Sequence, residues 1–289
     1  MWFILSLFSA IWGAISSLII KKLLGFLDMR LTLFCSILFV LPFTFLIILT
    51  TTGFPKLNSL FFLVIIIAAL IDVVAFIASI TALKISPLST ISPIASFSPI
   101  FTTILAAFAL REFPTTLKLV GIIIVVIGAY LLNIKHIRSG FSEPIKKLVS
   151  HKGVQLYFLA NFLWAITPIF QKIALENTFP KTPLMASFAN GILVVLFLIP
   201  FVIPKVKTSL AKVKNYIWVF LIIGLFGSLS QYAAYTAFSL ANLGYVTSIF
   251  KLQSIFMIIL AAMFLKEKDI REKLLGAVVM LIGAVLVAI

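Results

Sequence analysis

Residues 100–112 read IFTTILAAFALRE, and residues 255–267 read IFMIILAAMFLKE, so that 8 of 13 aligned positions are identical. The offset between the two stretches is 155, and the same offset places Gly121 on Gly276. The chain is therefore internally repeated. A repeat of this length predicts that the fold is built from two related halves.

The composition is that of a membrane protein. Of the 289 residues, 63% are hydrophobic and 11% are charged, and the mean hydropathy is +1.25. A soluble domain of this size needs more charge to cover its surface. Continuous apolar runs of about 20 residues, the length of a helix that crosses a bilayer, favour helices over a barrel. We count ten runs, at about 2–20, 31–50, 59–81, 86–110, 117–134, 154–173, 184–203, 216–240, 244–265 and 273–289.

The repeat divides the ten runs into two sets of five. We interpret residues 1–135 and 153–289 as two five-helix repeats, joined by a basic linker at 136–152. Because five is an odd number, the second repeat enters the membrane from the opposite side. The predicted fold is an all-α membrane protein with ten transmembrane helices in two inverted repeats. Inverted repeats are typical of secondary transporters, whose substrate lies near the membrane midplane where the repeats meet.

The alternative class is an intramembrane scaffold or enzyme that does not transport. An enzyme would need a nucleophile with its base, or a set of metal ligands. Both histidines, His136 and His151, fall in the linker, and Cys35 is the single cysteine. The sequence therefore favours transport over catalysis and predicts no metal site.

The distribution of basic residues predicts the orientation. Loops after odd-numbered helices carry 17 of the Lys and Arg residues, and loops after even-numbered helices carry 5. The positive-inside rule then places the odd loops in the cytoplasm and both termini outside. It also explains the net charge of +15 without nucleic acid as a partner.

A Trp-Gly pair and one doubled motif resemble EamA-type members of the drug/metabolite transporter superfamily, although the repeat-related Trp164 is followed by Ala165 rather than Gly. A Trp-Gly pair at Trp12 lies near the start, and a Glu closes the fourth and ninth helices before a Gly in the next helix. Those residues are Glu112 with Gly121, and Glu267 with Gly276. The resemblance covers essentially the whole chain. It implies a permease that exports small organic metabolites, amino acids and their analogues among them, through a cavity lined by helices 1–4 and 6–9.

Residues 85–101, ISPLSTISPIASFSPIF, contain three Ser-Pro pairs inside an apolar run. Proline removes a backbone donor, and at membrane depth such a break is tolerated only where it is buried or lines a wet cavity. We predict a broken, cavity-facing fourth helix in which Ser92 and Ser96 share a polar stripe. The ninth helix makes an equivalent stripe around Lys251. The alternative is that these small residues pack helices closely and bond their own backbone.

Two ionisable residues inside the spans are predicted to serve substrate binding or coupling. A Lys near the membrane centre costs at least roughly 2.5–3.5 kcal/mol on insertion scales. Lys251 lies about two turns into the ninth run, so we predict that it attracts a carboxylate or phosphate or exchanges protons. Asp72 is the only acid well inside a span and is predicted to be a proton-coupling site. An ion pair between these two residues is the structural alternative.

Further substrate-binding residues are predicted from polar and aromatic side chains within the spans. A few polar groups among aromatic walls suit a small amphipathic ligand. For each Trp, anchoring at the membrane interface is the alternative. The predicted residues of this kind are Trp12, Asn161, Trp164, Asn190, Gln231 and Tyr235.

The motif residues are predicted to be structural. A carboxylate is unfavourable at a helix C-terminus, so Glu112 and Glu267 are each expected to bond the start of the following helix or a nearby cation. Glycines seven residues apart lie on one helix face and allow close packing, within the molecule or in a dimer. Those glycines are Gly121, Gly128, Gly276 and Gly283.

No phosphate-cradling GxxxxGK[ST] loop occurs, so we expect neither ATP nor another cofactor to drive transport. Transport is then either facilitated or coupled to protons. The expected location is the cell membrane, and the expected partners are a small-molecule substrate and the lipid bilayer. The sequence is compatible with a monomer or a homodimer.

The charge bias generates a prediction for the C-terminus, where the family pattern implies the opposite. A reporter active only in the cytoplasm is fused after Ile289. We expect an inactive reporter, and a periplasm- or exterior-active reporter at the same site should report strongly. An active cytoplasmic reporter would contradict the orientation predicted from the loops.

Overall fold

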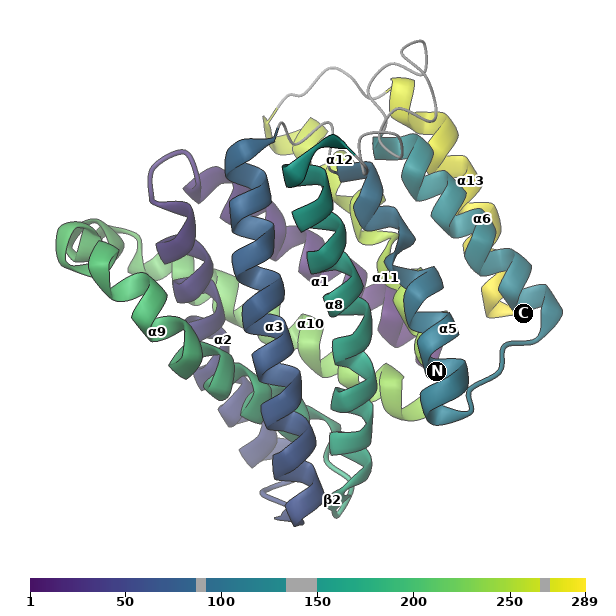
Figure 1. Cartoon of the computed structure of the whole chain (residues 1–289), viewed down its shortest axis with the longest axis horizontal. Helices are drawn as coiled ribbons and strands as arrows, with labels where there is room; N and C mark the ends of the chain where they lie inside the picture. The colour runs from purple at the N-terminus through teal and green to yellow at the C-terminus, as the bar shows by residue number, and fades with distance from the viewer. Residues whose placement is uncertain (87–91, 134–149, 266–270) are drawn as a thin grey trace. The chain divides into compact units, whose positions relative to one another are not determined.

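The computed structural model describes residues 1–86, 92–133, 150–265 and 271–289, and almost all of them are helical (Figure 1). The elements in chain order are α1 (Trp2–Leu23), α2 (Met29–Thr51), β1 (Lys56–Leu57), α3 (Ser59–Ile85), the 3₁₀ helix η1 (Ser92–Phe97), α5 (Ser98–Leu110), α6 (Thr116–Asn133), α8 (Lys152–Glu176), β2 (Thr178–Phe179), α9 (Pro183–Asn215), α10 (Ile217–Leu240), α11 (Leu243–Phe250), α12 (Gln253–Leu265) and α13 (Arg271–Ala288).

Eight helical stretches in the described residues are long and apolar enough to cross a membrane. Two of them contain a break, because Pro93–Leu110 joins η1 to α5 and Leu243–Phe264 joins α11 to α12. α6 and α13 are apolar as well but shorter. The prediction of a helical membrane protein is confirmed, and the two breaks fall in the fourth and ninth of the predicted runs.

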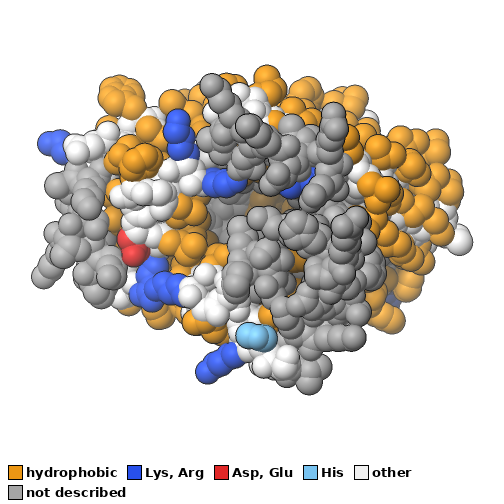
Figure 2. All heavy atoms as spheres, turned by 90° about the horizontal axis from the view of Figure 1, so that it is seen from above, with side chains coloured by type: hydrophobic (Ala, Val, Ile, Leu, Met, Phe, Trp, Pro, Cys, Tyr) orange, Lys and Arg blue, Asp and Glu red, His pale blue; other side chains and the backbone are white. Residues whose placement is uncertain are grey.

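Large apolar side chains are exposed along most of these helices, as expected of a surface that faces lipid. Figure 2 shows many of them in orange, together with several Lys and Arg side chains in blue. Phe108, Trp218 and Met263 are among the most exposed. A soluble monomer rarely leaves so much contiguous apolar surface in water.

The helices form two compact units. The first unit comprises Met1–Val73 and Phe170–Leu240, and the second comprises Val74–Ile169 and Ala241–Ile289. Each unit therefore draws segments from both halves of the sequence. The division falls inside α3 and α8, which each contribute to both units.

In the first unit, α1, α2, α9 and α10 pack around an apolar core. Leu31 and Cys35 of α2 lie against Phe220 and Ile223 of α10, all fully or nearly buried. Gly224 allows this approach, because a Cβ there would collide with the backbone of Phe39. The close contact of α2 with α10 therefore depends on a residue without a side chain.

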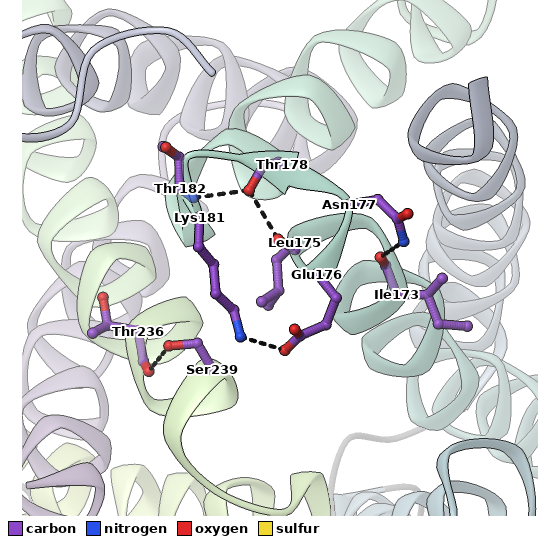
Figure 3. A network of polar contacts seen from close by, with 9 residues as sticks. All are labelled: Ile173, Leu175, Glu176, Asn177, Thr178, Lys181, Thr182, Thr236 and Ser239. Atoms are coloured by element: carbon purple, nitrogen blue, oxygen red, sulfur yellow. Dashed lines mark hydrogen bonds and ion pairs between the residues drawn. The ribbon is translucent and has the colours of Figure 1, made fainter. Parts of the chain in front are cut away.

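A short ladder and a set of local bonds fix the ends of α3 and α8 in the same unit. β1 pairs antiparallel with β2, and the amide nitrogen of Asn58 donates to Oδ1 of Asn177 at 2.7 Å. In the turn between α8 and α9, Thr178 Oγ1 donates to Leu175 O and accepts from the Thr182 N–H (Figure 3). The two Thr178 bonds satisfy the Leu175 carbonyl at the end of α8 and the Thr182 N–H at the start of α9.

In the second unit, α6 and α13 pack side by side and antiparallel, with glycines at the contact (Figure 1). A Cβ at Gly128 would lie 2.5 Å from Met280 N and 2.8 Å from Gly276 O. A Cβ at Gly283 would lie 2.6 Å from Val125 N and 2.7 Å from Gly121 O. Of the two uses predicted for the four glycines, the structure shows the contact within the molecule.

This geometry predicts that Gly128→Ala destabilises the protein. The added methyl would meet backbone atoms of α13, which move only if the helices separate, and overpacking of this kind costs about 1–3 kcal/mol. Thermal unfolding of the purified protein in detergent measures the effect. Gly25→Ala is the matched control, because its Cβ would meet only Lys22 O at an ordinary 3.5 Å. Equal unfolding temperatures for the two variants would contradict the packing.

Candidate functional site

Asp72 is held in the first unit by an amide from another helix. The Asn190 Nδ2 of α9 donates to Asp72 Oδ2 of α3 at 2.8 Å. Asn190 is 8% exposed, and its carbonyl oxygen Oδ1 has no hydrogen-bond partner among the described residues. Two predicted residues thus meet, and they leave an unsatisfied acceptor beside a carboxylate.

A second polar contact lies between α9 and α10 of the same unit. Ser187 Oγ donates to Gln231 Oε1 at 2.5 Å. Tyr235 of α10 is also buried and lies near Ser187 and Asp72. We call this set of polar side chains the α3–α9–α10 cluster. Its members are Asp72, Ser187, Asn190, Gln231 and Tyr235. Four residues predicted from sequence belong to it.

Lys251 occupies the break in the ninth span, in the second unit. It follows the last residue of α11, and its Nζ donates to the carbonyl of Ala95 in η1 at 2.8 Å. The break in one half of the repeat is therefore bonded to the break in the other. The sequence predicted a Lys on a regular helix here, whereas the structure places it where α11 ends.

The backbone around Lys251 is wound as a tight turn. The N–H groups of Lys251 and Leu252 bond to carbonyls three residues back, at 3.1 and 3.0 Å, and those of Ser254 and Ile255 do the same at 3.0 and 2.9 Å. This is the 3₁₀ pattern, which inside a longer helix often marks a functional hinge. The break satisfies its own donors, so it is compatible with membrane depth.

Ser96 lies next to Ala95 and is 2% exposed. Its Oγ has no hydrogen-bond partner in the described part of the chain. The side chain of Ser92, predicted to share its stripe, lies outside the described residues. The offset of 155 that aligns the two halves pairs Ser96 with Lys251, so the two breaks carry these residues at equivalent positions.

Small and hydroxylated residues near the two breaks form local contacts, as the packing alternative predicts. Thr103 Oγ1 donates to Pro99 O in its own helix, and Thr247 Oγ1 donates to Leu243 O. Gly244 packs so closely on Thr103 that a Cβ would collide with that side chain. These residues hold α11 against α5, and this contact brings the two breaks together.

The remaining predicted binding residues lie in less distinctive surroundings. Asn161 is buried and donates from Nδ2 to Tyr157 O, one turn back in α8. Trp164 is partly buried against Ala75, Ala78 and Ala160. In the first unit, Trp12 stacks on Phe8 of the same helix, with ring centroids 5.3 Å apart.

Glu112 binds a helix start, as expected, but the start belongs to the other half. Its Oε2 accepts from the Leu243 N–H at 2.7 Å, at the first residue of α11. A carboxylate there satisfies an open donor and complements the helix dipole. The sequence had pointed to the helix that follows Glu112 in the chain. Glu267 lies outside the described residues.

Sequence inspection missed the acceptor that holds Lys251. Ala95 contributes a backbone carbonyl, which side-chain patterns do not reveal. It also missed the pair Ser9 and Ser230, where Ser230 Oγ donates to Ser9 O at 2.8 Å between α1 and α10. For the contact between Lys251 and Ala95, the sequence offered one signal, which is that the repeat aligns Lys251 with Ser96, the neighbour of Ala95.

Comparison with known proteins agrees with the geometry. The model of the EamA-like transporter family matches residues 1–134 and 151–289. A solved structure titled "Crystal structure of protein" superimposes with a TM-score of 0.70 at 11% sequence identity, covering 99% of this chain and 95% of that chain. That likeness concerns the fold alone. A search of curated proteins finds no match.

The fold and the duplicated family match define the class as a helical membrane protein built from two repeats. The chain belongs to the EamA-like transporter family, in the drug/metabolite transporter superfamily. Members of this family are membrane transporters rather than enzymes.

The bond between Glu112 and α11 predicts different effects for two substitutions. Glu112→Ala removes the acceptor of the Leu243 N–H and should lower the free energy of unfolding by about 0.5–2 kcal/mol, as loss of a helix cap does. Glu112→Gln retains a side-chain oxygen and should cost less. The unfolding temperatures of the Glu112→Ala and Glu112→Gln variants, measured in detergent, distinguish these two effects. If Ala and Gln variants unfold alike, the carboxylate is not acting as a cap.

Proposed function

We propose that this chain is a secondary transporter that moves small organic metabolites, amino acids or their analogues, out of the cell. The observation that carries the proposal is the Lys251 ammonium group at a helix break inside a membrane span, bonded to the equivalent break of the other repeat. Broken helices with polar groups are the usual substrate-binding elements of inverted-repeat transporters. A charged residue at this depth is costly and is by default a functional residue.

The second unit offers a cationic donor at Lys251. Every amino acid carries a carboxylate, and an anionic oxygen is the strongest partner of an ammonium group. This match supports amino-acid-like substrates.

Ten spans are part of the proposal, with α6 and α13 as the fifth and tenth. The apolar stretch Thr116–Leu132 of α6 and Lys273–Ala288 of α13 are the shorter helices. At 1.5 Å per residue each covers about 25 Å, close to the bilayer core of roughly 30 Å. Two five-helix repeats of opposite orientation then alternate access to the two sides of the membrane.

Transport is either facilitated diffusion or proton exchange, and Asp72 and Lys251 are the coupling residues we propose. Asp72 accepts a hydrogen bond from the neutral Asn190 amide, so protonation of the carboxyl leaves a polar, uncharged contact in place. A group of this kind inside a span is suited to carry a proton during the transport cycle.

Solute counterflow in proteoliposomes tests the proposal. Vesicles loaded with pooled amino acids should take up the labelled pool, and Lys251→Ala should reduce the initial rate at least about 10-fold, the effect of losing a charge-assisted hydrogen bond. Asp72→Asn should remove the difference in rate between two pH values. Lys181→Ala, which removes an exposed ion pair with Glu176, is the control and should transport normally.

Uptake that is unchanged in both variants would leave a carrier whose site lies elsewhere. Absence of counterflow for amino acids and for a wider metabolite pool would contradict transport and favour an intramembrane scaffold.

A further inference from the structure

We infer that Lys251 and Ser96 form a subsite for a single carboxylate group, at the place where the 3₁₀ breaks of the two repeats meet. This deepens the proposed function, on which it rests, by assigning the chemical group that the substrate must carry. Both residues belong to the second unit.

The Lys251 ammonium group has capacity left for a ligand. An ammonium carries three N–H donors, and the described residues provide one acceptor for it, the Ala95 carbonyl at 2.8 Å. The side chain is partly buried at a helix break eight residues into its span. Two donors of a partly desolvated cation therefore remain for an anionic oxygen, which is their strongest partner.

Ser96 provides the second, independent observation. It is 2% exposed and its hydroxyl has no partner in the described residues. A buried unpaired hydroxyl is unfavourable for folding, so native structures seldom keep one without a use. The hydroxyl is one residue from the carbonyl that holds Lys251, and it can donate to the same anion that the ammonium group binds.

The charge of this region selects a carboxylate over a phosphate. Among the described residues of the second unit, Lys251 is the Lys or Arg in the interior of a span, and the others lie near helix ends, at Lys84, Arg111, Lys118, Lys152, Arg271 and Lys273. One ammonium group neutralises one carboxylate. A phosphate dianion would leave a net negative charge inside the membrane, which is costly without a second cation.

Ligand-induced thermal stabilisation of the purified protein in detergent tests the subsite directly. The probes are a pool of L-amino acids and the matching pool of amino-acid amides, which keep the ammonium group but lack the carboxylate. We expect the acids to bind more tightly than the amides. Lys251→Met should lower the apparent affinity for the acids at least about 10-fold and leave that for the amides within about 2-fold.

Lys118→Met is the matched control, because Lys118 also gives its ammonium group to a backbone carbonyl, that of Val287 at 2.9 Å, but lies near the start of α6. It should keep the preference for acids. Ser96→Ala separates binding from folding. Removal of an unpaired buried hydroxyl should leave the unfolding temperature without ligand unchanged or higher, while the affinity for the acids falls about 3-fold or more.

Several results would overturn the subsite: amides that bind as tightly as acids, no stabilisation by any acid, or a Lys251→Met variant that keeps the preference. Counterflow measured with the same pools separates this inference from the proposed function. Uptake of acids with a preference that survives Lys251→Met refutes the subsite alone. Acid-specific binding that depends on Lys251, without counterflow, refutes transport alone.

Discussion

The hydrogen bond between Lys251 Nζ and the Ala95 carbonyl joins the helix breaks of the two repeats, and the candidate carboxylate subsite depends on it. Inside a membrane, backbone that leaves the regular helix must find partners within the protein. η1 and the turn between α11 and α12 are such departures, and they occur at equivalent positions of the repeat. One side chain satisfies the backbone of the other break and brings a positive charge to it. The same contact therefore stabilises the two breaks and positions the ammonium group that we propose binds the substrate.

The rest of the second unit supports that contact. Glu112 holds the start of α11, and Gly244 lets α11 lie directly on Thr103 of α5. Because the start and one face of α11 are fixed, Lys251, which follows the last residue of α11, is positioned beside η1. α6 packs closely on α13 through glycines and also lies against η1 and α11, so it supports the same arrangement. The position of the short helix α11 thus depends on the Glu112 carboxylate and on the absence of a side chain at Gly244.

Much of the fold was predictable because membrane constraints are simple. The length of the apolar runs predicted the membrane helices. The Ser-Pro pairs predicted a break in the fourth helix, and the repeat pointed to the equivalent part of the ninth. Asp72 and Asn190 were each identified as polar residues inside spans, and the structure joins them. The contacts that were missed involve backbone groups or distant partners. The Ala95 carbonyl has no signature in sequence, and the partner of Glu112 lies in another half of the chain. Asn161 was predicted to bind substrate, yet its Nδ2 donor bonds its own helix, which composition alone does not distinguish.

The most direct test of the central claim is whether water reaches position 251 within the membrane. Cys35 is the single cysteine of the chain, so one substitution gives a cysteine-free background in which to place Lys251→Cys. We expect a membrane-impermeant thiol reagent to modify this cysteine in vesicles, because a position that binds substrate must be reached by water from one side of the membrane. A cysteine that reacts from neither side of the membrane, with or without substrate, would show that Lys251 is a packed structural residue and would contradict the account.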